Sequence, residues 1–376
     1  MVPSFLPQNV ANTCTSRRLF AKIKVYQSYY FVISILSLDE VVAMQEITQV
    51  NIKAKHQLLT GYHAVVQTAY VSSSTVYALQ LRHAGQDIYV LRGTCGPQVK
   101  LTKPALILTD SAGGHTQTWA PAGRQGQWFI GTKPSHSHMQ WDQQIARVDL
   151  TNMGVQYGSH LEFPRLGYLN RVGNYPVAGT AMKRIEAAVS PDLSRILIAS
   201  LEYNGTGHFT IYPLAAVNKA LDQAAKCSPA SRYVNLSALP YLEAVTVARL
   251  SPGWLNSVQG YAIDNLGNIY ISSQRAPGLN SQTGQFSPNL ARVIKIPVGG
   301  RGDQIQWTCV NLSARCQLAL TGTAAELEGI QVIGEDEVYL TVAYHVARMS
   351  WRQYTAYTAS NWTYRLSWGR KGFQSC

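Results

Sequence analysis

The sequence predicts an all-β fold arranged as a five-bladed β-propeller, and three observations lead to this prediction. Strand-forming residues recur throughout, and the chain contains 21 Tyr residues. Five segments share one order of elements: an apolar strand, a turn rich in Gly or polar residues, a strand rich in Tyr or Ile, and a third apolar strand. The segments start roughly 50–75 residues apart, near the length of a propeller blade with insertions.

The strands of the five units are expected at regular places. First strands are expected at 61–67, 114–119, 186–192, 259–264 and 328–333. Second strands are expected at 76–81, 127–131, 196–199, 269–273 and 338–342, and third strands at 88–91, 144–150, 208–212, 293–296 and 364–367. The fourth unit is the clearest, because its Asn265-Leu266-Gly267-Asn268 turn contains residues that tolerate positive φ, which is a hairpin signal.

Each blade also needs a fourth, outer strand. Candidates follow three of the units at 106–108, 233–237 and 307–313, but none follows the last unit. The segment 50–53 has the same character, so we predict that it completes the last blade and closes the ring, which removes an exposed sheet edge. A β-sandwich is the alternative, although five similar units at a long period fit it less well. One Ala-rich helix is expected outside the ring at 214–226.

The ends of the chain differ from the repeats, so the propeller domain is expected to span 44–368. In the first 43 residues, four basic residues precede an apolar run at 29–38. Three interpretations remain open: a translation start placed too early, a secretion signal, or a structural extension. The last stretch, 369–376, has no strand pattern and is expected to be a tail.

Composition limits the partners and cofactors that we expect. Lys and Arg number 32 against 20 Asp and Glu, a formal charge of +12 that suits an anionic partner. The basic residues are scattered with no run of five, so nucleic acid is not expected. The cysteines at 14, 95, 227, 309, 316 and 376 form no CxxC pair, and we expect incidental thiols, no metal site and no cofactor. A bond between Cys309 and Cys316 remains open.

Polar residues near the start of the first strands are the candidate binding site, because in a propeller these positions converge on a central channel. They form a funnel for an envelope sugar or peptide or for a metal ion, or they bond one another and plug the channel. Glu186 and Glu328 could be the pair of carboxylates that a glycosidase needs. A third, supporting acid would be expected in another unit, but the equivalent positions hold His63, His115 and Gln259, so no catalytic residue is assigned. The candidates are His63, His115, Gln117, Glu186, Gln259, Glu326 and Glu328.

Several stretches in order resemble the helveticin J family of large, heat-labile bacteriocins. They lie at 113–119, 126–135, 163–166, 168–171, 207–212, 268–274 and 339–345, within a resemblance that covers 44–368 and departs from the family near 240–252. The resemblance implies a secreted antibacterial protein that recognises and damages the envelope of competing bacteria, through an anionic polymer, a glycan or the membrane surface. The alternative is a propeller that binds or hydrolyses cell-wall glycans. The oligomeric state stays open.

Overall fold

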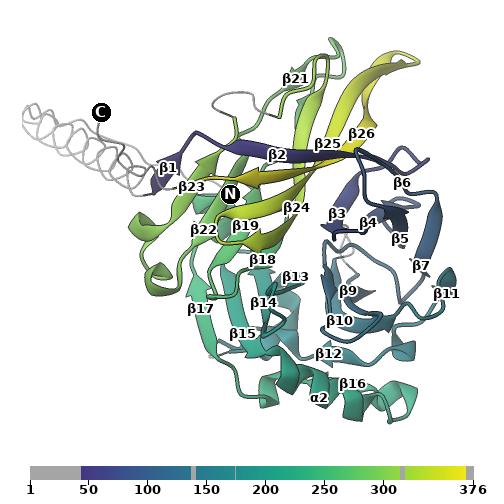
Figure 1. Cartoon of the computed structure of the whole chain (residues 1–376), viewed down its shortest axis with the longest axis vertical. Coiled ribbons are helices and arrows are strands. Elements are labelled where there is room, and N and C mark those ends of the chain that lie inside the picture. Colours follow the sequence, from purple (N-terminus) through teal and green to yellow (C-terminus); the bar gives the residue numbers. More distant parts are fainter. Residues whose placement is uncertain (1–43, 137–140, 174, 314–317, 370–376) are drawn as a thin grey trace, which may run out of the picture. The chain divides into compact units, whose positions relative to one another are not determined.

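The computed structural model describes residues 44–136, 141–173, 175–313 and 318–369, and their strands form five sheets around a ring (Figure 1). The predicted five-bladed β-propeller is confirmed. Three of the predictions above, those on the N-terminal extension, on most of the C-terminal tail and on a bond to Cys316, concern residues outside the described ranges. Cys95, Cys227 and Cys309 are free thiols.

Each blade contains four antiparallel strands that follow one another from the inside of the ring to the outside. Blade 1 contains β3 (Val66–Val71), β4 (Thr75–Arg82), β5 (Asp87–Thr94) and β7 (Lys103–Leu108). Blade 2 contains β8 (Trp119–Pro121), β9 (Gln127–Pro134), β10 (Asp142–Asp149) and β12 (Arg165–Gly167). Blade 3 contains β13 (Met182–Val189), β14 (Arg195–Glu202), β15 (Gly207–Pro213) and β17 (Glu243–Val247). Blade 4 contains β18 (Tyr261–Ile263), β19 (Ile269–Ser273), β22 (Arg292–Ile296) and β23 (Thr308–Asn311).

Blade 5 joins the two ends of the described chain. It contains β24 (Ala324–Gly334), β25 (Glu337–Ser350), β26 (Gln353–Ser367) and, from the N-terminal side, β2 (Asn51–Leu59). Strand β2 runs antiparallel to β26, with Asn51 opposite Ser367 and Leu58 opposite Asn361. The predicted closing strand is therefore confirmed, and it extends six residues beyond the predicted end at Lys53.

A fifth strand lies parallel to the outer strand in four of the blades. These strands are β6 (Gln98–Lys100) beside β2, β11 (Val155–Tyr157) beside β7, β16 (Tyr233–Asn235) beside β12, and β1 (Gln45–Ile47) beside β23. Each comes from the next blade in the ring, where it precedes the outer strand of that blade in the chain. In blade 4 the corresponding segment contains two short 3₁₀-helices, and its Arg301 forms an ion pair with Glu243 of blade 3.

Two expectations about single strands are corrected. The stretch 233–237 is not the outer strand of blade 3, because β16 joins the sheet of blade 2, and β17 fills that place. The inner strands of blades 1 and 2 begin later than expected, at Val66 and Trp119. Strands β8 and β16 have three residues each, too few for side-chain alternation to identify a partner, which explains the errors in blades 2 and 3.

The predicted helix is confirmed as α2 (Leu214–Ala224) and lies at the outside of blades 2 and 3 (Figure 1). It buries Leu214, Val217 and Leu221, which pack in one core with Phe129 of β9 and Leu166 of β12. The spacing of three and four residues places these side chains on one helix face. The helix therefore joins two blades through a shared core.

The remaining elements are short. They are β20 (Gly278–Leu279) and β21 (Phe286–Ser287), the irregular turn η7 (Leu250–Trp254), and the 3₁₀-helices η2 (His160–Glu162), η3 (Leu169–Arg171), η4 (Gly179–Ala181), η5 (Pro229–Ser231), η6 (Leu236–Ala238), η8 (Val298–Gly300) and η9 (Gln304–Gln306).

The inner strands of blades 4, 5 and 1 approach one another so closely that only glycine fits. A Cβ atom on Gly260 would lie 2.8 Å from the Cα of Gly329, and a Cβ on Gly329 would lie 2.2 Å from the Oγ1 of Thr68. Both positions exclude a side chain, so the backbones pack directly. This contact brings the polar residues that flank the two glycines, in β24 and just before β18, to the centre of the ring.

Candidate functional site

Each inner strand, or the short stretch just before it, brings a polar side chain to the centre of the ring. We call these five residues the central cluster: Gln67, Gln117, Glu186, Gln259 and Glu328. The side-chain amide of Gln117 connects them, because its Nε2 lies 3.3 Å from Gln67 Oε1, 3.3 Å from Gln259 Oε1 and 2.6 Å from Glu328 Oε2. Sequence reasoning named four of these residues and missed Gln67.

Glu186 is a buried carboxylate with a complete set of donors. Its oxygens accept hydrogen bonds from Thr116 Oγ1 at 3.1 Å, Thr118 Oγ1 at 2.5 Å and the backbone N–H of Gln117 at 3.1 Å. Arg184 Nε donates to it at 3.1 Å, and both side chains of this ion pair are 3% exposed. A buried ion pair with this many hydrogen bonds fixes side-chain positions more than it adds stability.

Arg184 is the central cation, and sequence reasoning missed it. Its guanidinium lies 4.1 Å from the ring centroid of Trp141, donates to the carbonyl of Val258 at 2.8 Å, and contacts the side-chain oxygen of Gln117 and the carbonyl of Gln259. Residues two apart on a strand face the same side, so Arg184 follows from the placement of Glu186. The sequence predicts that this strand begins at Glu186, whereas β13 begins at Met182, so Arg184 falls outside the predicted strand.

Two further carboxyl groups lie near this ion pair. Burial raises the pKa of Glu328 well above its usual value, and the nearby Glu326 raises it further. Burial and the charge of Glu186 raise the pKa of Asp142 in the same way, and neither carboxyl oxygen of Asp142 has a hydrogen-bond partner among the described residues. In both groups, burial therefore favours the neutral acid over the carboxylate.

The other predicted site residues lie at its edge or outside it. His115 stacks on Trp141 with ring centroids 3.7 Å apart, and its Nε2 lies 3.2 Å from Gln67 Oε1. Glu326 pairs with His345 of β25 at 2.9 Å. His63 is exposed and its ring lies 4.7 Å from that of Tyr357, so it is not bonded to the central cluster.

The side chains of the central cluster bond to one another and to neighbouring protein groups. On one side, a cavity of about 230 Å³ is lined by residues of all five inner strands, and Gln117 contributes to its wall. Much of the wall is small and apolar, with alanines at 69, 120, 187, 188 and 262. The arrangement holds the five blades together through one polar network.

A larger pocket lies beside blades 2 and 3, and sequence reasoning did not find it. We call it the Tyr168–Tyr233 pocket; its volume is about 440 Å³. The two ring centroids lie 5.9 Å apart, and a hydrogen bond that the Tyr233 hydroxyl donates to Tyr168 raises the pKa of Tyr233. None of the described residues that line it is Asp or Glu. The lining residues are Lys133, Gln143, Gln144, His160, Leu161, Arg165, Gly167, Tyr168, Leu169, Asn170, Gly179, Met182, Ile185, Ala230 and Tyr233.

Positive charge surrounds this pocket. The guanidinium of Arg165 is buried, donates to Gln144 Oε1 at 3.0 Å, and satisfies several backbone carbonyls of the 229–232 turn. Burial, together with the charges of Arg165 and Lys133, lowers the pKa of His160. The lowered pKa favours the neutral form of His160. Lys133 and Arg165 are the basic side chains of the lining, so an anion is the favoured occupant.

Neither metal binding nor a membrane-spanning helix is seen in the described part of the chain. Among the residues that the structure places, no group of three or more His, Cys, Asp or Glu side chains is arranged to hold a metal ion. No helix in the same ranges is long and apolar enough to cross a bilayer.

Solved structures with a similar arrangement are distant in sequence. The catalytic domain of the GH62 α-L-arabinofuranosidase of Coprinopsis cinerea aligns at a TM-score of 0.45 and 10% identity, over 85% of this chain and 98% of its own. A thermostable family-43 glycoside hydrolase aligns at a TM-score of 0.39 and 14% identity, over 82% and 90%. At these TM-scores the likeness supports no conclusion about this chain.

The sequence itself has a close relative and a matching family. The family model of the bacteriocin helveticin-J matches residues 46–369, which include all five blades. Bacteriocin helveticin-J of Lactobacillus helveticus is 44% identical over 344 residues, which cover 86% of this chain and 99% of that protein. This chain therefore belongs to the helveticin-J family of bacteriocins.

Proposed function

We propose that this protein is a secreted bacteriocin that binds an anionic, phosphate-bearing glycan of the target envelope in the Tyr168–Tyr233 pocket. One observation carries the proposal: the pocket combines two tyrosine faces and two cations, and none of its described lining residues is acidic. Membership of the helveticin-J family supports the antibacterial role. The formal charge of +12 supports an anionic target.

The lining residues make different contributions to ligand recognition. The faces of Tyr168 and Tyr233 suit the C–H faces of sugar rings, since aromatic rings combine a large apolar surface with a polar hydroxyl. The ammonium of Lys133 supplies mobile N–H donors for a phosphate, as lysine does in many phosphate sites. Arg165 adds charge rather than new hydrogen bonds, because backbone carbonyls already accept from it.

Amide side chains provide the selectivity for hydroxyl groups. Asn170 donates from Nδ2 to the carbonyl of Val177 at 2.7 Å, which fixes the amide in one orientation. Gln144 accepts from Arg165 through Oε1, which fixes its Nε2 as a donor. Oriented amides of this kind discriminate between hydroxyl patterns, because a mismatched ligand leaves them without a partner.

The pocket is tested by wall binding. Isolated walls of a sensitive strain are compared with walls from which the anionic polymer has been extracted, and bound protein is measured after sedimentation. We expect extraction to reduce binding by about tenfold, and Tyr168→Ala or Lys133→Gln to do the same on intact walls, since each contact contributes roughly 1–2 kcal/mol. Tyr203→Ala is the matched control, because Tyr203 is also exposed but lies outside the pocket. Equal binding to both wall preparations would overturn the pocket assignment.

The antibacterial role is tested separately. Purified protein is spotted on lawns of a broad panel of related strains, and we expect cleared zones on some of them. The native protein is expected in the culture medium of the producing strain. A panel without a single cleared zone would contradict the bacteriocin role whatever the wall experiment shows.

The alternative, hydrolysis of wall glycans, needs an acid and a base that reach the substrate. Burial raises the pKa of Glu328, as a general acid requires, but Glu328 and Glu186 are both buried and bonded to protein groups. Release of reducing sugar from purified walls that is lost in Glu186→Gln and Glu328→Gln would establish hydrolysis in place of binding alone.

A further inference from the structure

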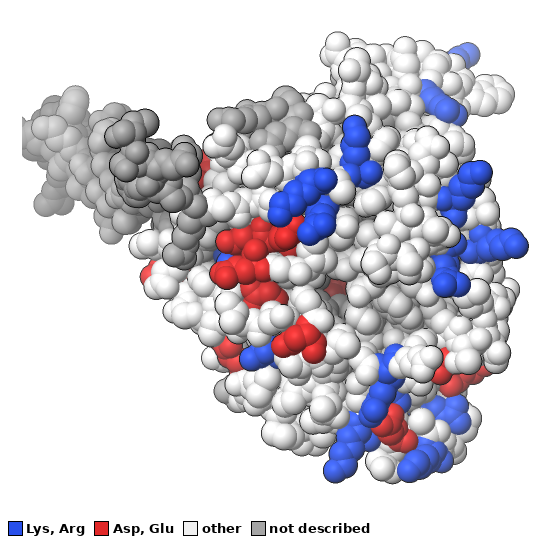
Figure 2. Space-filling view, in the orientation of Figure 1, with Lys and Arg blue, Asp and Glu red and all other residues white. Residues whose placement is uncertain are grey.

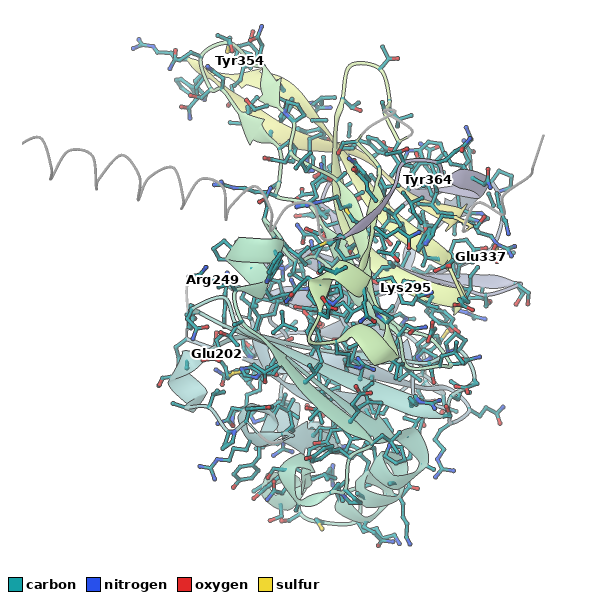
Figure 3. All side chains as sticks on the ribbon, turned by 90° about the vertical axis from the view of Figure 1, so that its left-hand side faces the viewer. Glu202, Arg249, Lys295, Glu337, Tyr354 and Tyr364 are labelled. Atoms are coloured by element: carbon teal, nitrogen blue, oxygen red, sulfur yellow. The ribbon has the colours of Figure 1, made fainter. Side chains whose placement is uncertain are left out.

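The hairpin of β25 and β26 extends beyond its blade as a two-stranded ribbon. Strand β24 pairs with β25 only as far as His345, and β2 pairs with β26 only from Asn361 onward. Residues 346–350 and 353–357 therefore pair only with each other, from Val346 opposite Tyr357 to Ser350 opposite Gln353. Figure 3 shows Tyr354 near the projecting end of this ribbon and Tyr364 within the body of the blade. A ribbon without sheet neighbours adds little stability of its own, so its length calls for another explanation.

The ribbon is held in its extended position. The backbone N–H of Tyr354 donates to the carbonyl of Ser281 at 2.7 Å, from the loop between β20 and β21. Gly284 of the same loop lies against the ring of Tyr354, where an added Cβ would be 2.8 Å from the ring carbon Cδ1. The contact braces the ribbon close to its tip.

The tip presents large apolar side chains to solvent. Trp351 is 99% exposed and Met349 is 59% exposed. Trp351 and Arg352 form the two-residue turn, and Trp351 has φ of 55°, in the left-handed region where such turns usually have Gly or Asn. A fully exposed tryptophan in a backbone conformation that it rarely adopts breaks a local rule, and such breaks concentrate at functional positions.

Only positive charge accompanies this tip. Arg348 lies with its guanidinium 3.3 Å from the ring centroid of Tyr357, Arg352 lies in the turn, and the sequence contains no Asp or Glu after Glu337. The bracing loop is similar, since no Asp or Glu occurs between Asp264 and Asp303. Figure 2 shows basic but no acidic side chains at the projecting end at the top of the view.

We propose that the tip of this ribbon docks on an anionic phospholipid bilayer, with Trp351 and Met349 in the headgroup region and Arg348 and Arg352 on lipid phosphates. Tryptophan prefers the membrane–water interface, and arginines beside it are attracted to anionic lipid. The indole is already exposed at the turn, so the ring enters the interface without a change of fold. This inference rests on the proposed envelope target and adds a second contact, made by blade 5 after the wall glycan is bound.

Vesicle binding tests the inference without any target cell. The full-length protein is sedimented with vesicles of phosphatidylglycerol and, in parallel, with vesicles of phosphatidylcholine. We expect binding to the anionic vesicles that falls about tenfold in Trp351→Ser and about fivefold in each of Arg348→Gln and Arg352→Gln. Leu266→Ser is the matched control, because Leu266 is also an exposed apolar residue in a hairpin turn and is expected to have no effect.

A second measurement locates the indole. Lipids with brominated acyl chains quench tryptophan fluorescence on contact, and we expect quenching in the wild-type protein that disappears in Trp351→Ser. Equal binding to both lipids, wild-type binding by Trp351→Ser, or quenching that persists in this variant would each overturn the inference. If the pocket proposal alone is wrong, the pocket variants bind walls like the wild type while vesicle binding still depends on Trp351. The two experiments therefore test the two proposals separately.

Discussion

Asn361 on β26 holds the inner strand of blade 1, because its Oδ1 accepts a hydrogen bond from the backbone N–H of Val66 at 2.9 Å. Its Nδ2 donates to the carbonyl of Ala64 at 3.0 Å, so one buried side chain replaces two missing strand contacts at the closure of the ring. We expect Asn361→Ala to lower the free energy of unfolding by about 1–3 kcal/mol, the cost of leaving a buried donor unpaired. Urea unfolding followed by circular dichroism measures this loss. Asn204→Ala, at an exposed position, is expected to change stability by less than about 0.5 kcal/mol.

Removal of Arg184 is expected to destabilise the centre of the ring. Arg184→Met leaves Glu186 as a buried carboxylate without its cation, which costs about 3–5 kcal/mol. The double variant Arg184→Met/Glu186→Gln is expected to recover part of that loss, since the unpaired charge is then absent. Urea unfolding of the two single variants and the double variant gives the coupling energy. Additive effects would contradict a direct ion pair.

The raised pKa values of Glu328 and Asp142 predict a pH dependence of stability. The native pKa values of Glu328 and Asp142 lie above those of the unfolded chain, so the native state binds more protons than the unfolded chain once the pH rises past the usual range of a carboxyl group. Stability from these groups is therefore full in acid and falls with increasing pH, by up to about 1.4 kcal/mol per pH unit for each proton. Unfolding midpoints between pH 5 and pH 9 measure the slope. We expect Glu328→Gln and Asp142→Asn each to flatten it, and an unchanged slope in both variants would contradict the assignment.

The start of the chain gives a further test. Every strand that the structure describes begins at or after Gln45, so a protein that begins at Met44 keeps all of them. We expect it to unfold at the same urea concentration as the full chain. A protein that begins after Leu59 lacks β1 and β2, exposes the edge of β26, and is expected to aggregate. Size-exclusion chromatography distinguishes the two, and a marked loss of stability in the first variant would show that 1–43 contribute to the fold.

The repeated units made the ring predictable, while the shortest strands were not. Hairpin turns such as Asp264 to Asn268 and the closing strand at Asn51 carry clear local signals, and both are confirmed. Strand β16 has three residues and was therefore assigned to the wrong blade. The sheet that a fifth strand joins is decided by its contact with a neighbouring blade, and the sequence of the strand itself does not indicate that contact.

The candidate site was predicted in part for a similar reason. Gln117, Glu186, Gln259 and Glu328 were found because equivalent positions of a repeat meet at its axis. Arg184 and the Tyr168–Tyr233 pocket were missed, since a partner two residues away and a pocket between two blades are relationships that the repeat does not encode. The exposed tip at Trp351 breaks the repeat altogether.

The fifth strands make each blade depend on the next one for its outer edge. Blade 1 releases its edge only when β11 detaches, and blades 2, 4 and 5 depend in the same way on β16, β1 and β6. Among the described residues, the edge of blade 3 has instead the ion pair of Glu243 with Arg301. Opening of the ring is therefore expected to start between blades 3 and 4, where an ion pair takes the place of a strand ladder.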